Sequence, residues 1–355
     1  MLRFALVGCG RIAKRHAELL SNNKVHNASL AAVCDTDIGK AEFFGKTFKV
    51  PHYTDFNIMM RQEKIDAVSV LTPSGLHAKH VIELSKYKKH IVVEKPMALT
   101  LEDADQMISA CDQGGIKLFV VKQNRYNYPV QKLKEALDEG RFGKIVMGTV
   151  RVRWCRDQKY YDQDKWRGTW AMDGGVFSNQ ASHHVDLLEW MLGEPESVFA
   201  KATTALVNIE AEDTGVAIIK FCSGALGIIE ATTATRPKDL EGSISILGEK
   251  GTVEIGGFAV NEMKVWNFVD QRETDKMVLD KYRDNPPDVY GFGHRVYLEH
   301  VVDAINNNKP ALVDGLEGRK SLALINAIYE SIETSKEVSL RYKAKKCKLG
   351  REENE

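Results

Sequence analysis

A lysine at a predicted strand end is the first residue of this chain that could do chemistry. Glu94-Lys95-Pro96 follows the apolar run 91–93, which has the character of a buried parallel strand. Open α/β sheets bind ligands at the edge where such strands end. Lys95 could there hydrogen-bond a reacting hydroxyl or change the pKa of a nearby base. A solvated lysine is the alternative, and the tripeptide alone does not decide between the two.

A glycine-rich turn near the N-terminus predicts the cofactor. Gly8-Cys9-Gly10-Arg11-Ile12-Ala13 fits the dinucleotide fingerprint G-x-G-x-x-G/A, directly after an apolar run and at the start of a helical segment. Gly8 permits a tight turn, Gly10 lets the backbone approach a pyrophosphate, and the helix N-terminus faces the phosphates. We therefore predict that Gly8, Gly10, Arg11 and Ile12 bind the cofactor.

Other predicted strand ends of the same sheet extend this cofactor site. Asp35 ends the second strand, where its carboxylate could accept hydrogen bonds from both ribose hydroxyls and repel a 2′-phosphate, so NAD is favoured over NADP. Thr72 and Pro73 end another strand, and we expect them beside the cofactor with Glu94 and Lys95. An ordinary strand-to-helix loop explains Thr72-Pro73 equally well.

A helix predicted over residues 176–192 carries a candidate base. At about 100° per residue, Asn179, His183 and Asp186 fall within one sector of that helix, whereas His184 points toward the packing side. His183 is therefore the better general base, with polar neighbours that could orient it. A purely structural histidine is the alternative.

Basic and aromatic residues gather between residues 151 and 170. The first of them alternate as in a strand with one polar face, whereas the later ones lack periodicity and are typical of a loop that covers an anionic substrate. We predict substrate contacts from Arg156, Trp166 and Arg167, and also from Asn124, Arg125, Lys95, Asn179 and His183.

The apolar pattern predicts two domains. From residue 3 to about 121, short apolar runs alternate with helix-length segments, as in a doubly wound parallel sheet. Beyond residue 122, longer strand-like runs separated by turns predict an α+β domain with an open-faced, largely antiparallel sheet. We predict an NAD-binding Rossmann domain over 1–122, a substrate-binding and oligomerisation domain over 123–342, and a disordered charged tail over 343–355. Helices in the second domain are predicted over 129–139, 176–192, 297–306 and 318–335.

Composition excludes several classes of protein. The 49 basic residues balance 49 acidic ones, which argues against nucleic acid or a membrane surface as the main partner. The six cysteines form no CxxC pair, so we predict reduced thiols in a cytoplasmic protein and no metal site. No apolar stretch approaches the length of a membrane span.

Three of these motifs together resemble a known family. Gly8/Gly10, Glu94-Lys95-Pro96 and the block 174–186 resemble, in order and spacing, the glucose-fructose oxidoreductase and inositol dehydrogenase family over nearly the whole chain. The resemblance implies an NAD(P)-dependent sugar oxidoreductase in which Lys95 and His183 match the family's lysine and histidine. Many members carry Asp four residues before that histidine, where this chain has Asn179.

Further motifs are similar to one group within that family, the bacterial UDP-N-acetylglucosaminuronate 3-dehydrogenases. They are Gln123-Asn124-Arg125-Tyr126-Asn127, Lys165-Trp166-Arg167-Gly168-Thr169-Trp170, Gly291-Phe292-Gly293-His294 and Val313 to Arg319. The similarity implies oxidation of the C3 hydroxyl of a UDP-sugar to a 3-keto sugar, which a transaminase converts for O-antigen and lipopolysaccharide synthesis. It also implies that NAD can stay bound and be reoxidised by 2-oxoglutarate.

We therefore predict that His183 takes the proton of a substrate hydroxyl, while Lys95 holds that hydroxyl and stabilises the developing oxyanion. An inositol or free-sugar dehydrogenase and a non-catalytic sensor of NAD and sugar are the alternatives. We also expect a homo-oligomer, a dimer or a tetramer, because an exposed sheet face suits subunit pairing.

Overall fold

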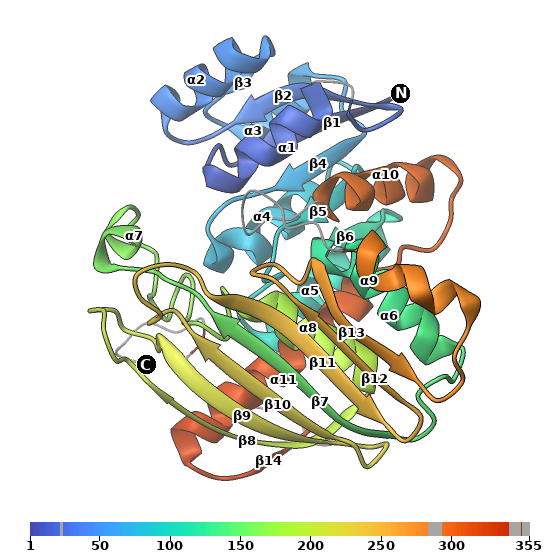
Figure 1. Cartoon of the computed structure of the whole chain (residues 1–355). Helices are drawn as coiled ribbons and strands as arrows, with labels where there is room; N and C mark the ends of the chain where they lie inside the picture. Colours follow the sequence, from blue (N-terminus) through green and yellow to red (C-terminus); the bar gives the residue numbers. More distant parts are fainter. Residues whose placement is uncertain (22–23, 283–292, 341–348, 350–355) are drawn as a thin grey trace. The chain divides into compact units, whose positions relative to one another are not determined.

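The structure is a computed structural model that describes residues 1–21, 24–282, 293–340 and 349. The chain forms two compact units, each built from two separate stretches of sequence (Figure 1). The first unit comprises Met1–Val121 and His294–Arg319, and the second comprises Lys122–Gly293 and Lys320–Glu355. Apart from Leu349, the tail predicted over 343–355 lies outside the described residues.

The first unit contains a parallel sheet of six strands in the order β3-β2-β1-β4-β5-β6. The strands are β1 (Leu2–Val7), β2 (Ala28–Cys34), β3 (His52–Tyr53), β4 (Ala67–Val70), β5 (His90–Val93) and β6 (Leu118–Val120). Every residue of the central strand β4 is buried, as expected where helices cover both faces of a sheet. The continuous apolar runs of the sequence therefore form the centre of this unit.

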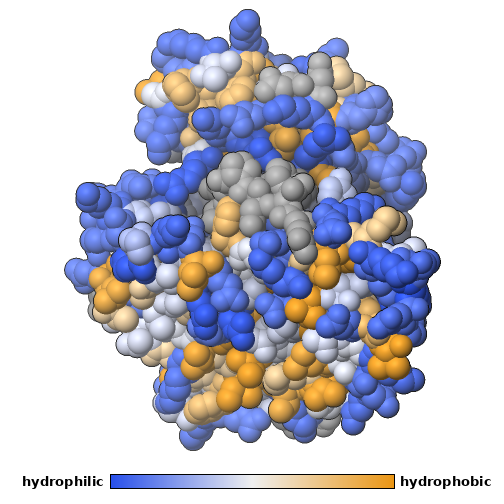
Figure 2. Space-filling model, viewed as in Figure 1, coloured by the Kyte–Doolittle hydropathy of each residue, from blue (hydrophilic) through white to orange (hydrophobic). Residues whose placement is uncertain are grey.

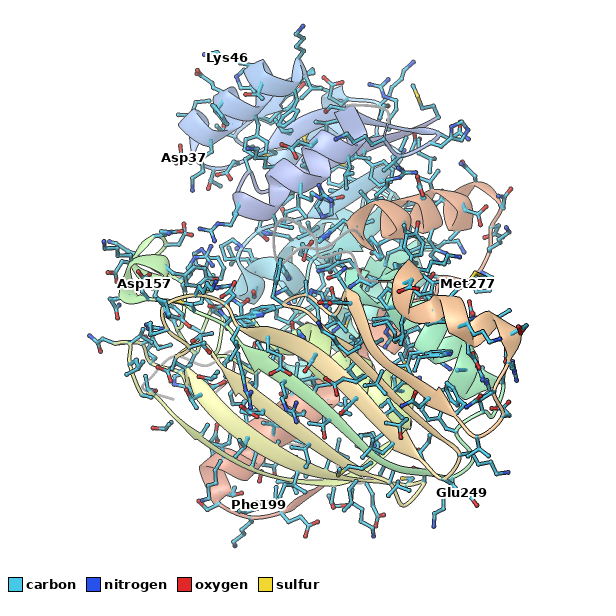
Figure 3. All side chains as sticks on the ribbon, viewed as in Figure 1. Asp37, Lys46, Asp157, Phe199, Glu249 and Met277 are labelled. Carbon is cyan, nitrogen blue, oxygen red and sulfur yellow. The ribbon has the colours of Figure 1, made fainter. Side chains whose placement is uncertain are left out.

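Helices connect the strands of the first unit. They are α1 (Arg11–Ser21), α2 (Ile38–Phe48), α3 (Phe56–Gln62), α4 (His77–Ser85) and α5 (Leu101–Gly114). A further helix of this unit, α10 (Gly293–Asn306), comes much later in the chain. Asp37, labelled in Figure 3, caps α2 by accepting hydrogen bonds from the backbone N–H groups of Gly39 and Lys40. Thr100 caps α5 in the same way, and Gly115 ends that helix in the left-handed conformation.

The second unit contains an eight-stranded sheet in the order β13-β12-β11-β7-β10-β9-β8-β14. The strands are β7 (Ile145–Arg153), β8 (Pro195–Thr203), β9 (Thr214–Phe221), β10 (Leu226–Thr232), β11 (Glu241–Gly248), β12 (Gly251–Gly256), β13 (Glu262–Phe268) and β14 (Val338–Ser339). Only β7 and β10 pair in parallel among these strands, and every other pair is antiparallel.

Helices cover one face of this sheet. The helices of the second unit are α6 (Tyr128–Asp138), α7 (Gln158–Asp162), α8 (Ser182–Leu192), α9 (Val278–Lys281) and most of α11 (Gly315–Thr334). Helix α8 packs against β7, β10 and β11, where Gly148 and Gly227 leave room for Leu188. On the other face, seen in front in Figure 1, apolar side chains remain exposed between polar ones (Figure 2), and these include Val146, Val216, Ile218 and Leu226.

The predicted fold class, a Rossmann domain with a largely antiparallel α+β domain, is confirmed. Strands β3, β13 and β14 were not expected from the sequence. Helix α10, which we expected beside the second sheet, groups from His294 onward with the first unit.

The helix predicted over 176–192 was wrong at its start, because α8 begins only at Ser182. Gly174 has a φ of +77°, and the backbone N–H groups of Val176 and Phe177 donate to Glu212 rather than along a helix. Asn179 therefore lies in a turn before α8. The alignment of Asn179 with His183 on one helical face does not hold.

No helix in the described residues is long and apolar enough to cross a membrane. The five cysteines in those same residues are all unpaired thiols, and three of them are buried.

Candidate active site

Three predicted cofactor segments of the first unit follow adjacent strands at one edge of the sheet. The backbone N–H of Leu71 donates to the carbonyl of Val7 over 2.8 Å, and that of Glu94 donates to the carbonyl of Val70 over 3.0 Å. The glycine turn after β1, Thr72-Pro73 after β4 and Lys95 after β5 therefore lie side by side at the carboxyl edge, where open sheets bind ligands.

The glycine turn has the shape that a dinucleotide needs. Gly8 has a φ of +100°, and a Cβ there would lie 2.7 Å from the backbone of Leu71, so a side chain cannot be accommodated. A Cβ on Gly10 would meet nothing within 4 Å, which leaves open space above the turn at the start of α1. These residues fit the phosphates of NAD.

Asp35 is held against this turn. One of its carboxylate oxygens accepts from the backbone N–H of Cys9 over 2.8 Å, and the other accepts from Asp37 over 2.9 Å. Each oxygen keeps a further lone pair that can accept from a ribose hydroxyl. The carboxylate thus stands next to the glycine turn with capacity for a ligand.

Glu94 joins the lysine turn to two buried histidines. One oxygen lies 3.1 Å from Nε2 of His16 and 3.7 Å from Nε2 of His294, and the other accepts from the backbone N–H of Lys95 over 3.1 Å. Burial disfavours ionisation of Glu94, but the hydrogen bonds and charges of the two histidines outweigh it and hold its pKa well below the usual value. Glu94 is therefore a buried carboxylate that anchors the backbone of Lys95, whose side chain is half-buried.

His183 stands in the first turn of α8 and is almost fully buried. The turn before it is held by residues from far along the chain. Tyr329 Oη accepts from the backbone N–H groups of Gly175 and Ser178 and donates to Glu212 over 2.9 Å. Burial raises the pKa of Glu212 to about 7. This network fixes the chain direction into the helix that carries His183.

Asn179 is connected to the predicted substrate loop through Asp173. Its side-chain amide donates to one carboxylate oxygen of Asp173, and the other oxygen accepts from the backbone N–H of Gly168 over 2.8 Å. Arg167, the preceding residue, stacks over the ring of Trp166 with 4.7 Å between the guanidinium carbon and the ring centroid. Asp173 therefore connects Asn179 to the segment that contains Arg167.

Arg156 also belongs to the predicted substrate loop. Its guanidinium donates to Asp239 over 2.8 Å and lies over the rings of Trp154 and Tyr160, each at 5.4 Å. The Trp154 ring in turn packs edge-on against His184, next to His183. Asp157, labelled beside α7 in Figure 3, caps the short helix that positions Tyr160.

Arg125 is not placed as we expected for a substrate ligand. Its side chain is fully buried and forms a bidentate pair with Asp186, at 2.7 and 2.9 Å. Lys122 lies 3.6 Å from the same carboxylate. We propose that Arg125 anchors α8 rather than contacting substrate. The neighbouring Asn124 is buried too, and its side-chain oxygen Oδ1 has no hydrogen-bond partner within the described residues.

His184 faces the core and makes the stability of the protein sensitive to acid. It is completely buried, and burial lowers its pKa to about 3. Because the unfolded state takes up a proton near pH 6.5, stability should be retained above that pH and fall by about 2 kcal/mol between pH 7 and pH 5. Urea denaturation of the native chain and of His184→Leu at both pH values measures this difference. An equal fall in both proteins would contradict it.

Several residues of these networks had no role predicted from the sequence. They are His16, Asp173, Glu212 and Tyr329, and also His294, which the sequence showed only as part of a family motif. Each acts through a partner far away in the chain or through a backbone group, and neither kind of contact leaves a local pattern.

Comparison with known proteins finds two domain models of one family. The family model described as "Oxidoreductase family, NAD-binding Rossmann fold" matches residues 2–122. The model of the same family's C-terminal alpha/beta domain matches residues 134–340. A myo-inositol 2-dehydrogenase of Thermotoga maritima is 30% identical over 96% of this chain and 98% of its own length.

Two solved structures are more similar in sequence. The WlbA dehydrogenase from Bordetella pertussis, solved in complex with NADH and UDP-GlcNAcA, is 43% identical with a TM-score of 0.88, over 95% of this chain and 98% of that one. The WlbA dehydrogenase from Chromobacterium violaceum, solved with the same two molecules, is 45% identical with a TM-score of 0.89, over 95% of both chains.

Proposed function

Since the chain belongs to the GFO/IDH/MocA oxidoreductase family and is an NAD-dependent sugar dehydrogenase, we propose that it oxidises the C3 hydroxyl of UDP-N-acetylglucosaminuronic acid to the 3-keto sugar. The observation that supports this substrate most is the similarity to two WlbA dehydrogenases that were solved with NADH and UDP-GlcNAcA. Both are covered over nearly their whole length, so the similarity includes the substrate domain.

Different residues of the first unit bind different parts of the cofactor. We assign the phosphates of NAD to the turn of Gly8, Gly10, Arg11 and Ile12, and the adenosine ribose to Asp35. Thr72, Pro73, Glu94 and Lys95 follow the neighbouring strands and complete the cofactor set. When bound, NAD accepts the hydride that leaves the sugar carbon.

The residues of the chain supply the acid-base chemistry. His183 takes the proton of the substrate hydroxyl as general base. Lys95 donates a hydrogen bond to that oxygen and stabilises its developing negative charge. The well-anchored backbone of Lys95 and the fixed entry into α8 suit this work, since both groups must be held in place before the reaction begins.

Substrate recognition falls to the second unit. A UDP-uronic acid carries a diphosphate and a carboxylate, and guanidinium groups are well matched to both. Arg156 and Arg167 flank the ring of Tyr160 at 5.4 and 4.8 Å, which forms a basic and aromatic surface for such a ligand. Trp166, Asn179 and the side-chain oxygen of Asn124, which has no partner within the described residues, complete the proposed set.

An inositol dehydrogenase is the second candidate, because the Thermotoga maritima myo-inositol 2-dehydrogenase is 30% identical over nearly the whole chain. Inositol carries neither a carboxylate nor a phosphate, so it offers no anionic group to Arg156 and Arg167, which in this chain pair with Asp239 and Asp164. That mismatch makes the UDP-uronic acid our first choice.

The deciding experiment measures NADH absorbance with UDP-GlcNAcA, UDP-GlcNAc, UDP-glucuronic acid and myo-inositol. We expect NADH only with the first, increased turnover when 2-oxoglutarate is added, and a 3-keto product by mass spectrometry. Reduction with myo-inositol but not with UDP-GlcNAcA would assign the second candidate. The proposal implies that the 3-keto product is the substrate of a transaminase in lipopolysaccharide synthesis.

We also propose a homo-oligomer, a dimer or a tetramer. The exposed apolar residues on the open face of the eight-stranded sheet support it. Pairing of subunits over this face would remove these side chains from water, whereas a monomer leaves them exposed. Size-exclusion chromatography with light scattering measures the mass directly.

A further inference from the structure

His77 is buried at the N-terminal end of α4, behind the two turns of the first unit that we assign to the cofactor and to catalysis. Its Nδ1 lies 2.8 Å from the carbonyl oxygen of Pro96, and its Nε2 lies 2.8 Å from that of Thr72. One imidazole thus touches the turn that follows β4 and the turn that follows β5.

The turn that carries Lys95 is therefore held on both sides of the lysine. On its N-terminal side, the carboxylate of Glu94 accepts from the backbone N–H of Lys95. On its C-terminal side, the carbonyl of Pro96 lies against His77. The lysine itself stands between two buried anchors, which fixes the origin of its side chain.

The turn after β4 is held from the same helix. Nδ1 of His80, one helical turn after His77, lies 3.0 Å from the hydroxyl of Thr72. The backbone at Leu71 and Thr72 also packs so closely on Gly8 that a Cβ there would lie 2.7 Å away. A movement of Thr72 would therefore reach the glycine turn, and His77 connects that turn to Lys95.

We propose that His77 is a positioning residue that sets Lys95 relative to the cofactor turns. It acts through the carbonyl groups of Pro96 and Thr72 and touches neither cofactor nor substrate. Both carbonyls only accept hydrogen bonds, and burial lowers the pKa of His77, so the neutral ring donates its single N–H to one of the two carbonyls at a time. An apolar ring of similar size at residue 77 would lose this donor and free the lysine turn. The inference rests on the proposed catalytic role of Lys95.

The test compares His77→Phe with His90→Gln. His90 lies at the opposite end of β5, where its Nδ1 accepts from the backbone N–H of Lys117 over 3.1 Å, so this variant alters a side-chain-to-backbone contact of a similar kind in the same sheet far from Lys95. We expect kcat to fall roughly 10- to 100-fold in His77→Phe, with little change in KM for the sugar, because a small misplacement of a catalytic group costs rate more than binding. His90→Gln should keep the native kcat.

The conservative variant His77→Gln provides a second measurement, because its amide restores one N–H donor. Its kcat should lie between those of the native chain and His77→Phe, and it serves as the test if His77→Phe does not fold. A native kcat in the folded His77 variant, or an equal loss of kcat in His77 and His90 variants, would overturn the inference.

A readout without turnover separates this inference from the proposed function. Reductive ¹³C-methylation labels lysine amines, and Lys95→Arg identifies the NMR signal of Lys95. That signal should be displaced in His77→Phe and unchanged in His90→Gln. If the native chain does not oxidise UDP-GlcNAcA but the signal is displaced, the proposed substrate fails and the inference stands. An undisplaced signal contradicts the inference whatever the substrate is.

Discussion

Alanine at Lys95 should lower kcat by about 10²- to 10³-fold, since the developing oxyanion loses its stabilising donor. Alanine at His183 should lower kcat by about 10²- to 10⁴-fold, because the reaction loses its general base. His183 is outside the cofactor set, so His183→Ala should bind NAD with native affinity, whereas Lys95→Ala loses one contact of that set and should bind NAD more weakly but still measurably. Single-turnover kinetics with the sugar and NAD titration by calorimetry measure the two quantities.

The control for the lysine is Lys46→Ala. Lys46, labelled in Figure 3, stands on α2 and pairs with Glu42 across one helical turn at the surface. Its removal should leave turnover and NAD binding unchanged. Near-native turnover in Lys95→Ala or His183→Ala would rule out the assigned chemistry, whereas loss of NAD binding in His183→Ala would point to a general disturbance of the fold.

The second large effect concerns the buried ion pair between Arg125 and Asp186 of α8. Asp186→Ala should destabilise the protein by about 3–5 kcal/mol, because Arg125 and Lys122 stay buried without their carboxylate. Burial opposes ionisation of Asp186, but the two cations outweigh it and lower its pKa. Its contribution to stability is therefore present above the pKa of the unfolded chain, near 3.9, and is lost as the pH falls further. Urea denaturation at pH 7 measures the loss.

The double variant Arg125→Met, Asp186→Leu provides the matched control. Removing both partners takes the guanidinium away with the carboxylate and leaves the Lys122 ammonium as the remaining buried cation of this group, so part of the stability lost in Asp186→Ala should return. If the double variant is as unstable as the single one, packing around α8 rather than charge pairing is responsible.

Local sequence patterns predicted most of the architecture. Runs such as Phe4 to Val7 became central parallel strands because continuous apolar residues suit only a sheet that is covered on both faces. The alternating burial of β9 likewise follows from one covered and one open face. Both signals are contained within a few neighbouring residues.

The failures arose where a distant residue overrides the local pattern. The residues from Val176 onward have a helical pattern, but Glu212 takes up the first N–H groups of that segment and delays the helix to Ser182. Strand β13 pairs with β12 across a register shift at Glu254, which blurs its alternation. Neither the contact with Glu212 nor the register shift at Glu254 can be read from the spacing of residues in the sequence.

The same distinction applies to the candidate site. The glycine fingerprint and Lys95 could be recognised because each belongs to a short segment with its own physical meaning. Arg125 could not be placed, since a guanidinium that binds substrate and one that pairs with a buried carboxylate look identical in sequence. His77 also had no local signal, because both its partners are backbone carbonyls.

The divided first unit has a consequence for synthesis of the chain on the ribosome. Strand β6 needs the backbone of Val313 and Asp314 beside it, and Glu94 needs His294, yet these residues emerge only after strands β7 to β13 of the second unit. The cofactor fold therefore stays incomplete until most of the second unit has been translated. A fragment that ends at residue 122 should lack the Val313–Asp314 partner of β6, so the unit that binds NAD is best expressed within the full chain.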